Sequence, residues 1–211
     1  VLKALDATGK GTDASVSQAI VYAVDHGASV INLSLGQYTP DASLFSALQY
    51  ANEHGVIVAA AAGNNGSDSV NYPAAYAKIF SNVIAVGATQ NSQDSLNMSA
   101  FSNHAGADTP YNFVDATGVD VLGIGLNGQE GYWSGTSMAT PFISAEAAIL
   151  KQAKPSASAI EIVQAITHSA QSISISAAGV HIDLATSTQS NAQSTYSASA
   201  SNYHLDSLNT H

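Results

Sequence analysis

Residues 56–61 form a run without a polar side chain, Val-Ile-Val-Ala-Ala-Ala, which soon ends in the turn sequence Gly-Asn-Asn-Gly at 63–66. A continuous apolar run of this length is typical of a strand that is covered on both faces of a parallel sheet. Residues 83–87 have the same character, and residues 30–33 share it apart from Asn32. Because such a strand cannot face water, the fold must place other elements on both faces of the sheet.

Two helical segments alternate with these strands. Apolar residues recur at helical spacing over 16–24 and 44–51, and Gly27 and Gly55 stand where a left-handed helix cap is expected. Strands that alternate with helices of about a dozen residues predict right-handed crossovers. We therefore predict an α/β fold with three layers, in which helices cover both faces of a mostly parallel central sheet.

Further elements follow from local signals. Asp13 and Asp41 are expected to cap the two helices. The apolar residues 1–5 predict a short strand, residues 156–168 predict another capped helix, and residues 180–184 predict the last strand.

The length of the chain predicts one domain. A chain of 211 residues with 45% hydrophobic content can build one sizeable core. We expect this domain over residues 1–186, followed by a linker or tail rich in Ser, Thr, Asn and Gln over 187–211. Because the chain begins at Val1, we expect it to be a processed or excised piece of a longer precursor.

The charge excludes two classes of partner. The net charge is -10 with only five Lys and Arg, so the chain would repel both a phosphate backbone and an anionic membrane surface. No apolar run approaches the ~20 residues that span a bilayer. We expect neither a nucleic acid nor a membrane partner. The absence of cysteine excludes disulfides, thiol nucleophiles and Cys-based zinc sites.

Residues 135–141, Gly-Thr-Ser-Met-Ala-Thr-Pro, place Ser137 at the start of an apolar helix, with Pro141 in its first turn. Free backbone N–H groups at such a helix start favour developing negative charge, which suits a nucleophile whose reaction makes an oxyanion. Spacing alone leaves open the alternative that Ser137 is an ordinary helix cap.

These residues match the nucleophile motif of the subtilisin family, Gly-Thr-Ser-Met-Ala-x-Pro, at every defined position. Residues 61–64, Ala-Ala-Gly-Asn, and residues 32–36, Asn-Leu-Ser-Leu-Gly, match two other motifs of that family in the family's order. The chain therefore resembles the C-terminal part, about two-thirds, of a subtilisin-like peptidase domain over residues 1–186. The N-terminal part of that domain is missing from this chain.

The resemblance implies roles for two residues. Ser137 resembles the nucleophile, and the side-chain amide of Asn64 resembles the donor that stabilises the oxyanion together with the Ser137 backbone N–H. A plain turn residue is the alternative for Asn64.

The resemblance also implies a substrate groove. The residues that resemble walls of the primary specificity pocket are Ser34, Leu35 and Gly36 on one side and Ala61, Ala62 and Gly63 on the other. Gly9, Lys10 and Gly11 resemble the edge segment that pairs with an extended substrate, and a plain turn explains them nearly as well.

The catalytic Asp and His of the family precede the serine in the chain, and neither motif occurs here. No His occurs before His26, and Asp6–Gly9 is only loosely similar to the Asp turn of the family. His26 and His54 each precede a helix-closing glycine, where an imidazole can face the negative end of the helix dipole. The resemblance thus implies a serine endopeptidase that forms an acyl-enzyme on Ser137 only when a companion N-terminal fragment supplies Asp and His. The chain alone is expected to be inactive.

Other functions compete with this one. A pseudoprotease or scaffold module would keep the fold and use the groove for binding. An esterase of the α/β-hydrolase type is disfavoured because the chain has no Gly-x-Ser-x-Gly elbow. The resemblance further implies secretion, autoprocessing and no cofactor for catalysis. A structural calcium ion is compatible with it but is assigned to no residue, although Asp115 lies near a position where family members can hold a loop cation.

Overall fold

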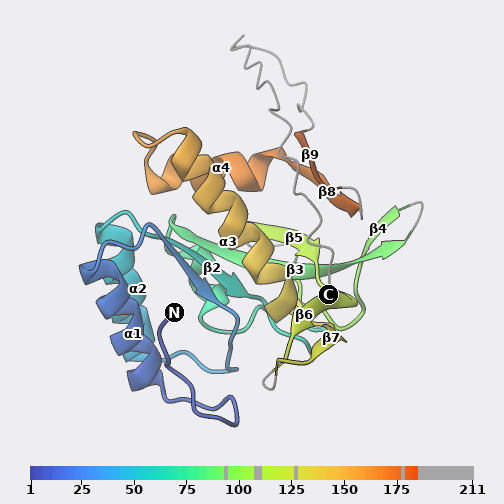
Figure 1. Ribbon diagram of the computed structural model, residues 1–211. Helices are drawn as coiled ribbons and strands as arrows, with labels where there is room; N and C mark the ends of the chain where they lie inside the picture. The colour runs from blue at the N-terminus through green and yellow to red at the C-terminus, as the bar shows by residue number, and fades with distance from the viewer. Residues whose placement is uncertain (93–94, 107–110, 126–127, 177–178, 185–211) are drawn as a thin grey trace, which may run out of the picture.

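The computed structural model describes residues 1–92, 95–106, 111–125, 128–176 and 179–184. These residues form a central sheet with helices on both of its faces, as Figure 1 shows. The predicted fold class is confirmed. The predicted tail over 187–211 lies outside the described residues, so the proposed domain boundary stays a prediction. None of the described helices combines the length and the hydropathy that crossing a membrane requires.

The central sheet is mostly parallel. Its strands are β1 (Val30–Leu33), β2 (Ile57–Ala61), β3 (Val83–Ser92), β4 (Ser95–Met98) and β5 (Phe113–Thr117). β2 lies between β1 and β3 and is parallel to both, and β3 also pairs in parallel with β5. Only β4 is antiparallel to its neighbour, β3. The carboxyl ends of β1 and β2 therefore lie at the same edge of the sheet.

The helices divide evenly between the two faces. α1 (Asp13–Asp25) and α2 (Ala42–Glu53) cover one face, and α3 (Thr136–Ala153) and α4 (Ala159–Ser169) cover the other (Figure 1). The side chains of β2 alternate between two hydrophobic cores, one beneath α1 and α2 and a second beneath α3 and α4. Val58 and Ala60 pack in the α1–α2 core, whereas Ile57 and Ala59 pack in the α3–α4 core. Because both faces of β2 are covered, the whole strand is apolar, as the sequence indicated.

The helix ends confirm most of the local signals. Gly27 and Gly55 have φ values of 79° and 66°, as a left-handed cap requires. Asp41 caps α2, since its Oδ1 accepts hydrogen bonds from the backbone N–H of Ser43 and Leu44. The prediction for α1 was wrong by one residue.

Thr12, and not Asp13, caps α1. The Thr12 side chain accepts from the Ser15 backbone N–H, and the Ser15 hydroxyl accepts from the Thr12 N–H, which satisfies two helix-end donors at once. The predicted helix 156–168 starts later than expected, at Ala159. Ser158 and Glu161 form the reciprocal cap there, and this pair decides where the helix begins.

The remaining described elements lie outside the central sheet and the four α-helices. β6 (Val121–Ile124) and β7 (Glu130–Trp133) form an antiparallel pair just before α3. A short 3-10 helix, η1 (Ala74–Lys78), precedes β3. β8 (Ala170–Ser176) pairs with β9 (Gly179–Leu184), which contains the predicted strand 180–184.

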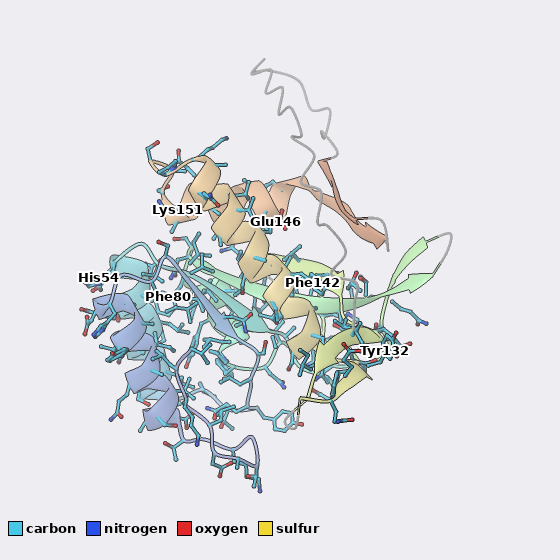
Figure 2. All side chains as sticks on the ribbon, viewed as in Figure 1. His54, Phe80, Tyr132, Phe142, Glu146 and Lys151 are labelled. Carbon is cyan, nitrogen blue, oxygen red and sulfur yellow. The ribbon has the colours of Figure 1, made fainter. Side chains whose placement is uncertain are left out.

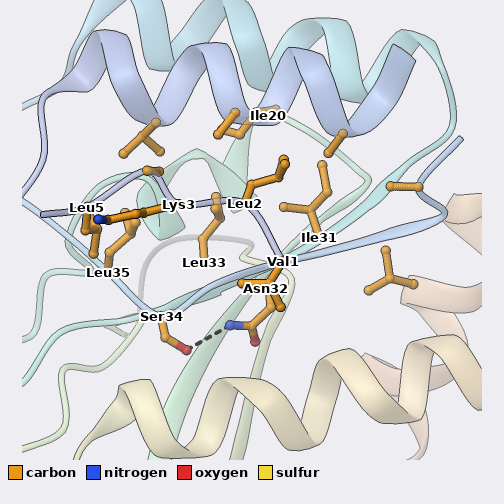
Figure 3. A pocket seen from close by; sticks show the side chains of 16 residues that line it. Val1, Leu2, Lys3, Leu5, Ile20, Ile31, Asn32, Leu33, Ser34 and Leu35 are labelled. Atoms are coloured by element: carbon orange, nitrogen blue, oxygen red, sulfur yellow. Dashed lines mark hydrogen bonds between the residues drawn. The ribbon is translucent and has the colours of Figure 1, made fainter. Parts of the chain in front are cut away.

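The predicted strand over residues 1–5 does not form. These residues run beside β1 and α1, and a cavity of about 640 Å³ with mostly apolar walls lies between them (Figure 3). A β-strand needs a hydrogen-bonded neighbour, and in the described part of the chain β1 pairs only with β2. The short apolar run was therefore insufficient to predict a strand.

Helix α4 allows a matched test of the second core. Ile162 is 2% exposed and packs against the sheet, whereas Ile160 on the same helix is 45% exposed. We expect Ile162→Ala to lower the free energy of unfolding by about 2–5 kcal/mol, because it removes buried methyl groups and leaves a cavity. Ile160→Ala should change it by less than about 1 kcal/mol. Urea unfolding followed by circular dichroism measures both, and equal losses would contradict the described packing.

Candidate active site

Ser137 is the second residue of α3, and it is brought to the edge of the sheet by a close backbone contact. The Gly135 N–H donates to the Gly118 carbonyl at 2.7 Å, directly after β5. A Cβ atom at Gly118 would lie 2.8 Å from the Gly135 oxygen, so a side chain there would force the two segments apart. Gly118 therefore allows the start of α3 to contact the strand ends.

Asn64 follows β2 and is tied to the start of α3 through its side-chain oxygen. Asn64 Oδ1 accepts from Thr136 N at 2.8 Å and from Thr136 Oγ1 at 2.9 Å. Thr136 is fully buried, and its Oγ1 also accepts from the Gly63 N–H at 3.2 Å. Since Oδ1 is occupied by these two bonds, Nδ2 is the atom of Asn64 that remains to donate beside Ser137.

A small cavity lies next to these two residues. It has a volume of about 210 Å³, and its walls contain six of the residues that the sequence singled out: Leu35, Gly36, Ala61, Gly63, Asn64 and Ser137. Its other lining residues are Tyr38, Asn65, Asn71 and Thr136. None of the ten lining residues is Asp, Glu, Lys, Arg or His. The arrangement therefore suits a neutral ligand group next to a hydroxyl and an amide donor.

The remaining residues of the predicted groove lie elsewhere. Ala62 is fully buried and packs in the α1–α2 core, so its side chain does not line the cavity. Gly9, Lys10 and Gly11 are not among the lining residues of the cavity either. They belong to an exposed turn in which Asp6 Oδ1 accepts from the N–H groups of Thr8 and Lys10.

Ser34 contacts the nucleophile segment through its hydroxyl, which donates to the Ser137 carbonyl at 2.8 Å. This carbonyl lacks the usual helical donor because Pro141, four residues later, has no N–H. Pro141 is the sixth residue of α3 and so is not in its first turn, contrary to the sequence prediction. Ser34 Oγ in turn accepts from Asn32 Nδ2 at 2.9 Å, as the dashed line in Figure 3 shows.

Comparison with known proteins identifies the family of this chain. A family model described as the subtilase family matches residues 1–204. The chain belongs to the subtilase family. It is 42% identical over 175 residues to a thermophilic serine proteinase of Bacillus sp. (strain AK1), and the match covers 82% of this chain and 40% of the relative. It is 37% identical over 179 residues to subtilisin Savinase of Lederbergia lenta, with 82% and 60% covered.

Solved structures of subtilases have the same fold. Sphericase superimposes with a TM-score of 0.71 at 28% identity, over 80% of this chain and 59% of that one. The self-cleaved protease domain of PatA superimposes with a TM-score of 0.66 at 33% identity, over 78% and 62%. The chain thus spans between two-fifths and two-thirds of the length of these four proteins.

Two of the residues that organise this subtilase site were not predicted from the sequence. Thr136 lies inside the nucleophile motif, which could have marked it as important but not as the partner of Asn64. Asn103 lies in a polar segment without periodicity, yet it is fully buried and bonds to the loop that follows β2. No local signal could have identified Asn103, because its partners are more than 30 residues away.

The two histidines with predicted helix-end positions occupy them. His26 Nδ1–H donates to the Tyr22 carbonyl and His54 Nδ1–H to the Tyr50 carbonyl, both at 2.8 Å. Figure 2 shows His54 on the outer side of the α1–α2 layer, away from the α3 helix on which Phe142 is labelled. In the described part of the chain, no hydrogen bond joins the Ser137 hydroxyl to another side chain.

Asp115 on β5 is a partly buried residue whose carboxyl oxygen Oδ1 is buried. Its Oδ1 has no hydrogen-bond partner, and burial raises the pKa of Asp115, an effect that the charge of His104 partly offsets. The described residues contain no cluster of three or more His, Asp or Glu that could hold a metal ion. The loop cation near Asp115 stays a prediction.

The raised pKa of Asp115 predicts a pH-dependent stability. A carboxyl whose pKa is higher in the folded state stabilises the fold below the unfolded value of 3.8, and this contribution is lost as the pH rises through the folded pKa. Asp115→Asn should therefore raise the free energy of unfolding at pH 8, by about 1.4 kcal/mol for each unit of pKa elevation. At pH 3 the same substitution should give no gain.

Urea unfolding at the two pH values measures this effect. Asp68→Asn is the control, because Asp68 lies in an exposed loop. A gain for Asp115→Asn that is equal at pH 3 and pH 8, or a loss at pH 8, would contradict the assigned cause.

Proposed function

We propose that this subtilase is a serine endopeptidase that cleaves peptide bonds through an acyl-enzyme on Ser137. One observation carries the proposal. The bonds from Thr136 to Asn64 Oδ1 leave Nδ2 as the donor beside the first turn of α3, where Ser137 lies. A hydroxyl, a free amide donor and a helix amino end in one place are three of the groups that acyl transfer uses, and a general base is the fourth.

The reaction follows from these groups. The Ser137 oxygen attacks the carbonyl carbon of the substrate while its proton passes to a general base, and the carbonyl oxygen becomes an oxyanion. Asn64 Nδ2 and the Ser137 backbone N–H donate to this oxyanion, and the amino end of α3 adds a favourable dipole. The peptide C–N bond then breaks as the base returns the proton to the leaving amine. Water then attacks the acyl carbon and gives a proton to the base. The ester C–O bond breaks, the base returns the proton to the Ser137 oxygen, and the carboxylic acid product leaves.

The cavity beside Ser137 supports an uncharged substrate side chain. A charged group would enter a space of about 210 Å³ without an ionised partner among its ten lining residues, at the cost of desolvation. Leu35 and Tyr38 supply apolar surface, and Tyr38 is 77% exposed at the rim. We propose an aromatic or aliphatic side chain at this position. Leu35 and Gly36 would form one wall and Ala61 and Gly63 the other. Residues 9–11 would form the edge that pairs with the extended substrate farther from this cavity.

The general base is proposed to come from a companion N-terminal segment that carries the catalytic Asp and His. Three observations support such a segment. The Ser137 hydroxyl has no side-chain partner among the described residues, and one edge of β1 is unpaired there beside an apolar cavity of about 640 Å³. Ile149 on α3 is also 56% exposed. Without this segment the hydroxyl keeps its ordinary acidity, so the chain alone is proposed to be inactive.

We also propose that the active protein is secreted and arises by autoprocessing. Among the solved relatives, the protease domain of PatA is self-cleaved. The low charge content, 9%, and the absence of cysteine are compatible with an extracellular enzyme.

A pseudoprotease or binding module is the second candidate. It is favoured by the same lack of a described partner for the Ser137 hydroxyl, since a groove can bind an extended peptide without a general base. Peptide and simple ester substrates separate the candidates: peptide cleavage supports the endopeptidase, ester turnover alone supports an esterase, and binding without turnover supports the module.

The decisive test treats the complete natural protein with a serine-reactive fluorophosphonate and locates the adduct by mass spectrometry. We expect the label on Ser137, and none on Ser137→Ala. Asn64→Ala should lower kcat by about 10²–10³ with little change in KM, because it removes one oxyanion donor. Asn52→Ala on α2 is the control and should keep kcat. Absence of label, in material that contains an Asp- and His-bearing segment, would contradict the endopeptidase and favour the binding module.

A further inference from the structure

The loop that carries Asn64 is held from behind by a neighbouring segment, residues 99–104. The backbone joins the two at several points: Gly66 N–H donates to the Phe101 carbonyl at 2.8 Å, and His104 N–H donates to the Ser67 carbonyl at 2.8 Å. The segment itself is anchored to the sheet, because the Ala88 N–H of β3 donates to Ser102 Oγ at 2.9 Å. The position of the loop thus depends on β3 as well as on β2.

Asn103 makes most of the side-chain contacts in this interface. It has no solvent-exposed surface. Its Nδ2 donates to Ala62 O at 3.1 Å, to Asn65 Oδ1 at 2.9 Å and to Asn71 Oδ1 at 3.3 Å, and all three acceptors belong to the loop or to the residue that begins it.

The oxygen of the same amide bonds to the backbone of the loop. Asn103 Oδ1 accepts from the backbone N–H groups of Asn65 and Ser67, both at 3.1 Å, and the Asn103 N–H donates to the Gly63 carbonyl at 3.0 Å. The residues immediately before and after Asn64 are therefore both bonded to Asn103. Asn64 itself is exposed, so its position depends on this backbone together with the two bonds from Thr136 to its side-chain oxygen.

Gly63 shows how closely the loop approaches Asn103. Its φ of 113° lies in a region that side chains disfavour, and a Cβ atom there would lie 2.4 Å from Asn103 Nδ2. The turn that directs Asn64 toward α3 can therefore form only with the Asn103 amide packed against a glycine.

We propose that Asn103 is the positioning residue for the oxyanion donor Asn64. Thr136 determines which end of the Asn64 amide faces α3, and Asn103 determines where the backbone places that amide. The proposal rests on the endopeptidase function above. Because oxyanion donors act only within a narrow range of distance, a small displacement of the loop should reduce stabilisation of the transition state more than binding of the substrate.

Asn103→Asp is the sharpest substitution. The aspartate has the same shape, but an oxygen replaces Nδ2 and so faces three oxygen acceptors instead of donating to them. Asn82→Asp is a matched control. Asn82 is 1% exposed, and its Nδ2 donates to the Val56 carbonyl at the opposite end of the sheet, so it shares the burial but not the location.

The experiment is a double-mutant cycle of Asn103→Asp and Asn64→Ala in the complete protein. Each kcat is calculated per active site, with the active sites counted by fluorophosphonate labelling. Asn103→Asp should lower kcat about tenfold or more, with KM changed less than about twofold. In the Asn64→Ala background the same substitution should lower kcat by less than about twofold, because its target is already absent. Asn82→Asp should leave kcat per reactive site unchanged. Equal losses of kcat in both backgrounds, or no loss in either, would overturn the proposal.

A second measurement separates failure of this proposal from failure of the endopeptidase function. If the unsubstituted protein cleaves no peptide, the function fails, and amide hydrogen exchange then tests the positioning directly. Asn103→Ala should accelerate exchange at Asn65 and Ser67, whose N–H groups lose their acceptor, and Asn82→Ala should not. Unchanged exchange at these two amides would overturn the positioning role without reference to activity.

Discussion

Two hydrogen bonds to a single oxygen, Asn64 Oδ1, connect the end of β2 to the start of α3, and the geometry of the site depends on them. Both come from Thr136, which is fully buried, so water cannot reach the donor side of either bond. They orient the Asn64 amide, and they hold the loop after β2 against the helix turn that contains Ser137. The Gly63 N–H bond to Thr136 Oγ1 completes the junction.

The sheet makes this junction available. β1 and β2 are parallel, so Leu35 and Gly36 after one strand meet Gly63 and Asn64 after the next. α3 is held against the same edge because Ile143 and Ala147, both fully buried, pack on the sheet face opposite α1 and α2. Ser34 adds a polar tie by donating to the Ser137 carbonyl that Pro141 leaves without a helical donor.

The buried polar groups near the site are mostly neutral amides and hydroxyls. Asn103, Ser102 and Thr136 bond through groups that keep one protonation state over the ordinary pH range, so their contribution to the fold does not depend on pH. Asp115 differs, because burial raises the pKa of its carboxyl and leaves one oxygen unpartnered. The positioning of the donor and the pH dependence of stability therefore come from different residues.

The sequence by itself determined the layers, the helix ends at Gly27 and Gly55, and the likeness of residues 135–141 to a known nucleophile motif. These features are local, because period, propensity and turn conformation act over a few residues. Only the tertiary structure decided that Thr136 orients Asn64, that Ser34 supplies a donor to Ser137, and that residues 1–5 lack a strand partner. Each of these depends on groups far apart in the chain, whose approach is determined by how the sheet and α3 pack together.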